Sequence, residues 1–313
     1  MSMEATPASQ AAIKELRESS MLTQQLARPA RSYLSASWAK LRSDWIAMAA
    51  LGVLVLVGVL AFTSPWINAH VLRQDPNVID LEYIFAAPSA QHWLGTDELG
   101  RDVLARVLVA GRVSLSIGLA VSLISMTLGV FVGLISGFFG GIIDDVSNAL
   151  IQTLLNIPLL FLLLILSLVF RPSPLALAFI IGITGWMGTA RLVRGEVFSI
   201  RERDYVEAAR MVGATNWRIM TRHVLPNVVS LIIVVAAFAV AGAILAESGL
   251  SFLGVGIQPP TATWGNMLIN SREYVKNAWW LLAAPGTMIF LTNLGIFLFA
   301  NGLRDALDPW VTD

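Results

Sequence analysis

Six long segments of the chain consist of apolar and small polar residues without a single charged side chain. A helix needs about 20 such residues to cross a hydrocarbon layer about 30 Å thick. Backbone polar groups in lipid must be paired within the protein, and the segments lack the alternation of barrel strands, so we expect helices. The six segments are 45–62, 113–143, 146–170, 172–190, 224–246 and 277–303.

Glycine, proline and acidic residues divide the longer apolar runs. The second segment is too long for one crossing, and we expect its helix to end at Gly137, Gly140 and Gly141, with the acidic pair 144–145 marking the turn. The run 171–174, Arg-Pro-Ser-Pro, separates the third segment from the fourth. The pattern predicts an all-α membrane protein with about six transmembrane helices. Close helix packing is indicated by the glycines of the second segment: Gly118, Gly129, Gly133 and Gly137.

The composition agrees with a membrane protein. Of the 313 residues, 56% are hydrophobic and 13% are charged, whereas soluble domains carry roughly 25% charged residues. The net charge is zero, so nucleic-acid binding gains no support. The absence of cysteine excludes disulfides and thiol chemistry, and His70, His92 and His223 are too far apart in sequence for a histidine metal cluster. We expect neither a metal site nor a cofactor in this chain.

No catalytic motif accompanies the apolar segments. The sequence contains no Gly-x-x-x-x-Gly-Lys-Ser/Thr phosphate loop, no His-Glu-x-x-His pair and no nucleophile elbow. We therefore expect no catalytic residue and no enzyme activity in this chain.

The basic residues are distributed unevenly between the segments. The N-terminal arm 1–44 holds six Lys and Arg, the loop 191–223 holds seven and the tail 304–313 holds one, which is 14 of the 21. Because Lys and Arg collect in cytoplasmic loops, we expect both termini and this loop to be cytoplasmic. The expected organisation is the arm, a first transmembrane helix with an outer loop over 45–112, a five-helix core over 113–303 that includes the loop, and the tail.

The loop 191–223 carries the sharpest pattern in the chain. Helix-forming residues that include Glu207, Ala208 and Ala209 lead to Gly213, which suits a helix C-terminus with positive φ. A second short helix is expected to follow and to stop at Pro226. The small alanines would let the groove of another protein close around the helix. A plain surface loop whose alanines only favour helix explains the residue types equally well.

The spacing Glu-Ala-Ala, three residues, Gly, and later Leu-Pro resembles the coupling loop of bacterial ABC importer permeases, which sits in a cleft of the ATP-binding subunits. The general pattern favours an aliphatic residue at His223. Arg-His at this place is familiar in the peptide-importer branch, so we interpret His223 as a marker of that branch. The residues that the resemblance assigns to ATPase coupling are Glu207, Ala208, Ala209, Gly213, Leu225 and Pro226.

Three further segments resemble the dipeptide, oligopeptide and nickel branch of the same family. Residues 92–115 contain His-Trp-Leu-Gly-Thr-Asp, Gly-Arg-Asp and Gly-Arg-Val-Ser-Leu. Residues 247–265 contain Glu-Ser-Gly-Leu-Ser-Phe-Leu-Gly, Gln-Pro-Pro and Trp-Gly, and the tail from Gly302 reads Gly-Leu-Arg-Asp-Ala-Leu-Asp-Pro. The similarity covers roughly residues 40–309 and points to the second, C-type permease of a pair.

The outer segments also have physical interpretations of their own. Asp102 and Arg106 are four residues apart and can pair on one helix face, and Gly95 and Gly100 suit tight turns. A well-packed entry to the second helix explains these residues at least as well as direct substrate contact. Glycines and a Pro-Pro pair in 247–265 prevent one long helix, so we expect a re-entrant or surface-lying element at the outer mouth.

Polar residues within or beside the apolar segments are candidates for the substrate path, because polar groups in lipid are costly and often functional. Amides that join helices by hydrogen bonds are the competing explanation. Glu247 could equally cap a helix or contact the amino terminus of a substrate. The path candidates are Gln152, Asn156, Trp186 and Glu247, with Asn293 as a further amide.

The resemblance implies a passive pathway subunit of an ATP-driven importer in the bacterial cytoplasmic (inner) membrane. Its partners would be a homologous B-type permease, two ABC ATPase subunits that use ATP and Mg, an extracytoplasmic substrate-binding protein and membrane lipid. The implied solutes are di- and oligopeptides, with nickel chelates, glutathione or opines as alternatives. A secondary transporter would usually show ionisable residues inside the membrane, and a membrane enzyme would need a catalytic cluster, so both are weaker hypotheses.

Overall fold

The computed structural model describes residues 33–170, 173–269 and 271–307. Within these residues all regular elements are helices, and the only strand-type pairing is an isolated bridge between Thr96 and Asp102. The long helices are α3 (Trp45–Phe62), α5 (Val103–Phe139), α6 (Gly141–Leu155), α7 (Leu159–Phe170), α8 (Pro174–Arg201), α11 (Leu225–Phe252) and α13 (Trp280–Leu307). The short ones are α2 (Tyr33–Ser43), α4 (Ser64–Ile67), α9 (Asp204–Met211), α10 (Asn216–Ile219) and α12 (Ser271–Tyr274), with π-helical turns η1 (Asn68–Leu72) and η3 (Met220–Val224) and 3₁₀ turns η2 (Leu81–Tyr83) and η4 (Asn266–Leu268).

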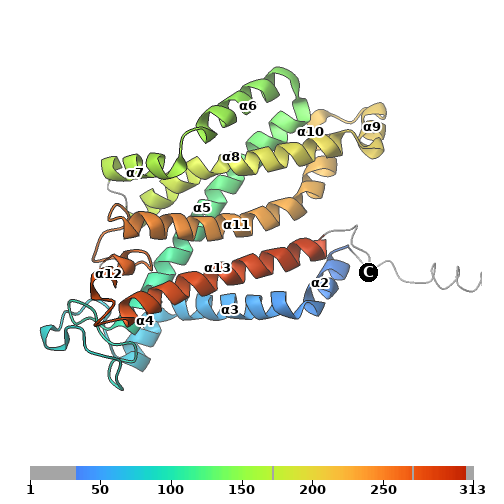
Figure 1. Cartoon of the computed structure of the whole chain (residues 1–313). Coiled ribbons are helices and arrows are strands. Elements are labelled where there is room, and N and C mark those ends of the chain that lie inside the picture. The colour runs from blue at the N-terminus through green and yellow to red at the C-terminus, as the bar shows by residue number, and fades with distance from the viewer. Residues whose placement is uncertain (1–32, 171–172, 270, 308–313) are drawn as a thin grey trace, which may run out of the picture.

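The described chain passes up to six times between two ends of the molecule. Helices α3, α5, α8, α13 and the continuous stretch through α11 are each long and apolar enough to cross a membrane, and α6 and α7 together meet the same test as one span that is bent by 78°. Figure 1 shows α9, α10, α2 and the C-terminal end of α13 at one end, here called the α9 end. The loops 68–102 and 253–279 lie at the other end, here called the long-loop end.

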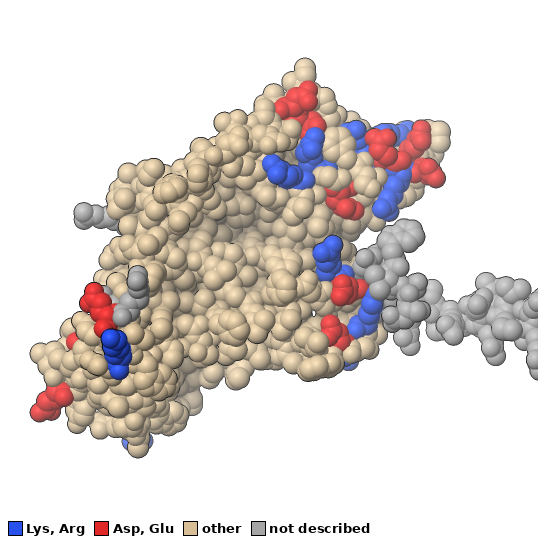
Figure 2. Space-filling model, viewed as in Figure 1, with Lys and Arg blue, Asp and Glu red and all other residues tan. Residues whose placement is uncertain are grey.

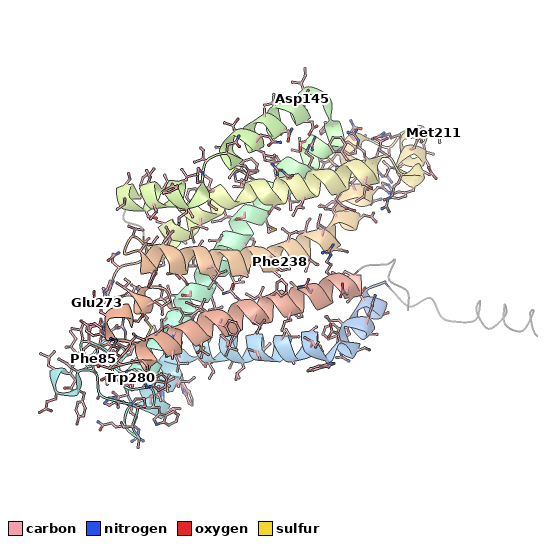
Figure 3. The ribbon with its side chains drawn as sticks, in the orientation of Figure 1. Phe85, Asp145, Met211, Phe238, Glu273 and Trp280 are labelled. Atoms are coloured by element: carbon pink, nitrogen blue, oxygen red, sulfur yellow. The ribbon has the colours of Figure 1, made fainter. Side chains whose placement is uncertain are left out.

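The surface between the two ends is apolar. Charged side chains gather at the ends, with a broad uncharged band between them on the face seen in Figure 2. In Figure 3 Met211 lies at the α9 end, Glu273 at the long-loop end and Phe238 midway between them. Large apolar side chains remain exposed in the band, among them Leu123 and Phe131. Such a surface needs lipid or protein around it, and the prediction of an all-α membrane protein is confirmed.

Helices α5 and α8 form the tightest helix pair, because glycines let their backbones approach. A Cβ atom at Gly129 would lie 2.5 Å from Thr189 Cβ, and one at Gly133 would lie 2.6 Å from the Ala190 carbonyl oxygen. On another side of α5, a Cβ at Gly118 would lie 3.1 Å from Ile244 in α11. The prediction that these glycines serve close helix packing is confirmed. In Figure 1, α5 runs obliquely behind the other long helices, from the long-loop end toward α6.

Of the boundaries expected near α5 and α6, one is confirmed and others were wrong. Helix α5 begins earlier than the second apolar segment, at Val103, and it ends before Gly140, whose φ is +66°, so the expected end at Gly140 and Gly141 is confirmed. Gly137 lies inside the helix, and the acidic pair 144–145 lies in the first turns of α6, past the turn it was expected to mark. The third segment is not one straight helix, because the chain bends just before Pro158, which cannot donate a backbone hydrogen bond.

Two further boundaries, at the cytoplasmic loop of the sequence prediction, were also wrong. Helix α8 continues past Ala190 to Arg201, so the first part of the segment 191–223 is an extension of α8 and the true loop is shorter. Pro226 does not stop a helix either. It lies in the first turn of α11, directly after the π-helical turn η3, so the helical path from Asn216 runs on into α11. The helix can continue through Pro226 because the π-helical turn before it changes the backbone hydrogen-bond pattern at the place where proline has no N–H to donate.

The described ends of the chain contact each other at the α9 end. Leu41 of α2 is buried with Ala47 and Ala306 in one small cluster. Most of the expected N-terminal arm, the end of the tail motif and Arg171–Pro172 of the expected turn lie outside the described residues. Ser173, the next residue of that turn, caps α8.

Candidate functional site

The α9–α10 loop is shaped by a glycine turn of the expected kind. Helix α9 ends at Met211, and Gly213 follows with φ +81°. The Gly213 amide donates to the Arg210 carbonyl (3.0 Å) and the Ala214 amide donates to the Ala209 carbonyl (3.0 Å). This pair of bonds is a Schellman motif, which satisfies the last carbonyls of a helix. The Thr215 side chain then accepts from the Arg218 amide and caps α10.

A buried apolar cluster ties this loop to the transmembrane helices. Val206 of α9 and Ile219 of α10 are fully buried with Val197 of α8 and Phe138 of α5. Arg201 closes the cluster, because its Nη1 donates to the Gly137 carbonyl (3.0 Å) at the end of α5. A helix end leaves four carbonyls without partners, so Arg201 satisfies one of them. A force applied to α9 is therefore transmitted to α5 and α8 through side chains in direct contact.

The outer surface of the loop is apolar at its tip. Met211, Val212 and Trp217 are 79%, 85% and 71% exposed. Glu207 and Ala208 are exposed beside them, whereas Ala209 is half-buried against the cluster. Exposed apolar groups at the tip of a charged loop are typical of a protein contact. Sequence reasoning missed these three tip residues, although apolar residues close to Gly213 in an otherwise charged segment were a usable signal.

The remaining coupling candidates lie at the base of the loop. Leu225 is half-buried and Pro226 is exposed, both in the first turn of α11. His223 lies next to α9, with its ring centroid 6.5 Å from that of Tyr205. The structure therefore separates the candidates into an exposed helix, Glu207–Ala208, and a hinge-like base that connects it to α11.

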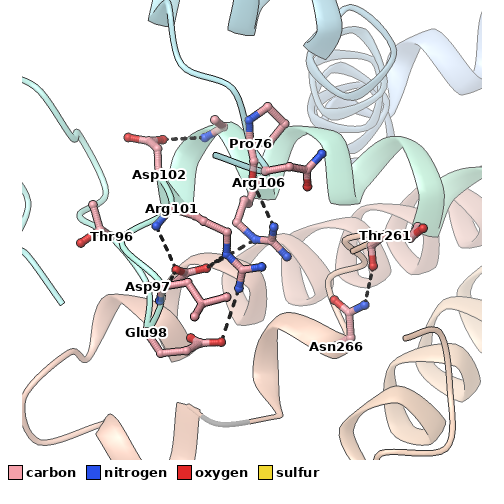
Figure 4. Close-up of polar contacts among 12 residues, drawn as sticks. Pro76, Thr96, Asp97, Glu98, Arg101, Asp102, Arg106, Thr261 and Asn266 are labelled. Atoms are coloured by element: carbon pink, nitrogen blue, oxygen red, sulfur yellow. Dashed lines mark hydrogen bonds and ion pairs between the residues drawn. The ribbon is translucent and has the colours of Figure 1, made fainter. Parts of the chain in front are cut away.

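A buried charge network orders the long-loop end, and Figure 4 shows its contacts. Asp97 accepts from Arg101 Nε at 2.7 Å and lies 3.6 Å from Arg106 Nε. Asp102 caps α5 by accepting from the Ala105 amide (2.8 Å), and its other oxygen lies 3.0 Å from His92 Nδ1. The expected pair between Asp102 and Arg106 was therefore wrong, because the N-cap position turns the Asp102 carboxylate away along the loop.

Gly100 is the tight turn that this network requires. Its φ is +72°, and a Cβ atom there would lie 1.7 Å from the Asp80 carbonyl oxygen. Gly95 also has a positive φ, as expected of a turn. The Trp280 indole donates to the Thr96 carbonyl (3.0 Å), which fixes the loop on α13. The loop that precedes α5 is thus well packed against the first turn of that helix.

Glu247 lies fully inside the molecule at the end of α11. Its Oε1 accepts from the Ser251 hydroxyl (2.8 Å) and its Oε2 lies 3.4 Å from the Ser114 hydroxyl on α5. The Trp264 amide donates to the same Ser114 oxygen (3.2 Å), so the carboxylate connects α5, α11 and the loop after α11. The loop after α11 contains no long helix, as expected from its glycines and prolines, and Trp264 is buried within it.

Comparison with known families decides the class of the protein. Residues 129–313 match the family described as "Binding-protein-dependent transport system inner membrane component", and residues 32–88 match "N-terminal TM domain of oligopeptide transport permease C". The chain belongs to this family of inner-membrane ABC importer permeases. The first match includes the α9–α10 loop and the second includes α2 and α3, so the resemblance inferred from the motifs is confirmed. The family supplies the membrane component of its transporters and is not itself catalytic.

Relatives of the permease cover nearly its whole length. The dipeptide transport system permease protein of Bacillus subtilis (strain 168) is 38% identical over 90% of this chain and 87% of its own. The probable D,D-dipeptide permease of Escherichia coli (strain K12) is 38% identical over 82% of this chain and 85% of its own. The oligopeptide permease of the same strain is 38% identical over 84% of this chain and 86% of its own.

The candidate path residues of the permease fall into two separate regions. Gln152 is exposed on α6, and Asn156 is exposed at the bend between α6 and α7. Trp186 of α8 packs near them, against the buried cluster of Ile151 on α6. Glu247 belongs to the network at the long-loop end. The structure therefore brings Trp186 next to α6, and it does not bring Glu247 to the other three.

Proposed function

We propose that this permease is a passive pathway subunit that imports di- or oligopeptides when separate ATPases drive it. It works with a homologous B-type permease, two ABC ATPase subunits and an extracytoplasmic binding protein. The chain itself binds no nucleotide or metal. The α9 end, with both termini, faces the cytoplasm, and the long-loop end receives the solute from the binding protein.

The α9–α10 loop is the observation that carries this proposal. Its exposed tip and the Glu207–Ala208 surface offer a contact for an ATPase groove, and the Val206 cluster connects that contact to α5 and α8. Conformational energy passes only if the loop binds differently in the two nucleotide states of the ATPase. Closure of the ATPase dimer would then move α9 and alternate the access of the path between the two sides.

The peptide assignment draws on the long-loop motifs and on the relatives, which are named as dipeptide and oligopeptide permeases. Nickel chelates, glutathione and opines remain alternative solutes of the same machinery. A secondary transporter is less favoured, because the coupling-type loop would then have no motor to bind. The candidates Gln152, Asn156 and Trp186 supply amide and aromatic groups that tolerate varied side chains.

Reconstitution in liposomes tests the proposal. The full assembly should accumulate labelled dipeptides in the presence of ATP, whereas the lone chain should neither hydrolyse ATP nor accumulate solute. Accumulation by the lone chain contradicts the proposal that it is a passive subunit. Transport of only a nickel chelate, glutathione or an opine contradicts the assignment of peptides as the solute. Glu207→Lys should abolish ATPase binding to the solubilised permease pair. Glu82→Lys, an exposed charge reversal at the opposite end, is the matched control and should leave that binding unchanged.

A further inference from the structure

A cleft lies between the first turns of α8 and the outer half of α5, at the long-loop end. Its volume is about 370 Å³, within the roughly 300–1,000 Å³ range of small-ligand sites. The side chains that form it are mostly aliphatic, and only Arg112 and Ser116 bring polar side-chain groups. The lining residues are Val109, Arg112, Val113, Ser116, Ile117, Ala120, Pro174, Leu175 and Ala178.

Arg112 is a cation without a counter-charge in the described part of the chain. It is exposed, and no described residue gives it an ion pair or a hydrogen bond. Arg101 at the same end pairs with Asp97, and Arg194 in the other half of the molecule pairs with Asp144. A guanidinium on an otherwise apolar wall is a candidate binding group, because its N–H donors match an anionic ligand. The cleft therefore offers a free cationic group to an anion from outside this chain.

On the basis of the peptide import proposed above, we propose that this cleft binds the C-terminal end of the transported peptide. Arg112 holds the terminal carboxylate, and the Ser116 hydroxyl, one helical turn further along α5, donates a second hydrogen bond. A guanidinium matches a carboxylate with two parallel N–H donors. The aliphatic walls bury the last side chain of the peptide without selecting its chemistry, as a carrier of many peptides requires.

A neighbouring cleft favours a zwitterionic peptide over an anionic lipid. It has a volume of about 440 Å³ and shares Val109 with the first cleft. It is lined by Asp75, Gln74 and Arg73, and of the two Asp75 carboxylate oxygens only Oδ1 has a partner among the described residues, the Asn77 amide at 2.8 Å. Asp75 can receive the ammonium group of a short peptide whose carboxylate is at Arg112. A phospholipid phosphate would use the cation alone.

The test compares a labelled dipeptide with its C-terminal amide in the reconstituted full assembly, with the binding protein saturating for each. Arg112→Gln should lower uptake of the free acid by about tenfold, since a hydrogen bond to a charged group is lost, and should change uptake of the amide by less than about twofold. Arg112→Lys keeps the positive charge and should retain part of the acid uptake that Arg112→Gln loses. Lys276→Gln removes another exposed cation at this end and should leave the acid-to-amide ratio unchanged.

A second variant covers the case in which Arg112→Gln does not assemble. Leu175 is 78% exposed and lines the same cleft, so Leu175→Glu places a competing carboxylate beside Arg112 without disturbing buried packing. It should reduce uptake of the acid selectively. Three results for the variants overturn the inference. The first is an equal loss of uptake for the acid and the amide, the second is a loss that depends only on phosphatidylglycerol in the vesicles, and the third is unchanged uptake. Failure of the peptide function itself is distinct, because the wild-type assembly would then take up neither compound.

Discussion

The loop at the α9 end depends on one backbone conformation. Gly213 has φ +81°, and a Cβ atom there would meet nothing within 4 Å. A side chain at this position therefore costs backbone strain of about 1–2 kcal/mol and no steric clash. Because the turn sets the direction of α10 relative to α9, that strain acts on the surface that we propose docks into the ATPase.

Gly213→Val should abolish ATP-driven uptake while the permease still inserts in the membrane. Valine is β-branched and strongly disfavours a positive φ, so the turn rearranges. Gly213→Asn is the matched control, since asparagine adopts this conformation at lower cost, and it should keep most of the uptake. The measurements are uptake and ATPase stimulation at equal amounts of inserted protein. Normal transport by the valine variant would contradict the coupling assignment.

At the scale of the elements, α5, α6 and α8 form one mechanical unit by two different means. Glycines bring the α5 and α8 backbones together, whereas α6 is held to α8 by an ion pair. Arg194 donates to both carboxylate oxygens of Asp144, with Nη2 2.7 Å from Oδ2, and its guanidinium also lies 4.7 Å from the Phe198 ring centroid. The pair is partly shielded from water and bidentate, the geometry in which such pairs are strongest.

Gly133→Ala should destabilise the α5–α8 pair. The added Cβ would lie 2.6 Å from the Ala190 carbonyl oxygen, so the helices have to separate. Overpacking of this kind costs about 1–3 kcal/mol. Gly188→Ala adds the same methyl group where nothing lies within 4 Å and serves as the control. Thermal unfolding in detergent measures both, and equal midpoints for the two variants would contradict the packing argument.

Asp144 and Arg194 should show a coupling energy in a double-mutant cycle. We expect Asp144→Asn and Arg194→Gln each to loosen α6, and the double variant to lose less than the sum, with a coupling of about 0.5–3 kcal/mol. Hydrogen exchange of the α6 amides reports the loosening. Strictly additive effects would show that packing, and not the ion pair, holds α6.

At the scale of the whole molecule, both described chain ends lie at the α9 end, where Leu41 of α2 is buried with Ala306 of α13. This arrangement agrees with six crossings, in which α6 and α7 count as one bent span. Which end faces the cytoplasm follows from the basic residues and the positive-inside rule. In the view of Figure 2, more charged side chains of both signs are visible at the α9 end than at the long-loop end.

Single cysteines test this orientation, because the chain has none of its own. Thr215→Cys lies in the exposed α9–α10 loop and should resist a membrane-impermeant thiol reagent in intact cells. Glu273→Cys lies exposed at the long-loop end and should react. Both should react after the membrane is opened, which controls for accessibility. The reverse pattern in intact cells would invert the proposed topology.

The sequence by itself determined the features that depend on neighbouring residues. Apolar length alone predicts the crossings, because backbone in lipid must be helical. The Gly213 turn and the close packing at Gly129 were predictable from residue type, since only a residue without a Cβ suits either place at low cost. The family motifs likewise lie along the chain, and they are the basis on which we propose the α9–α10 loop for coupling.

The tertiary structure alone decided which distant groups meet. Helix α8 runs past its apolar segment, and in that extension Arg194 pairs with Asp144, fifty residues earlier. Asp102 turns to His92 and not to Arg106 because the loop folds back over the start of α5. Arg112 faces a cleft only because α8 supplies the opposite wall. Hydropathy and turn preference act between neighbours in sequence, whereas ion pairing, burial and cavity shape depend on elements that only the fold brings together.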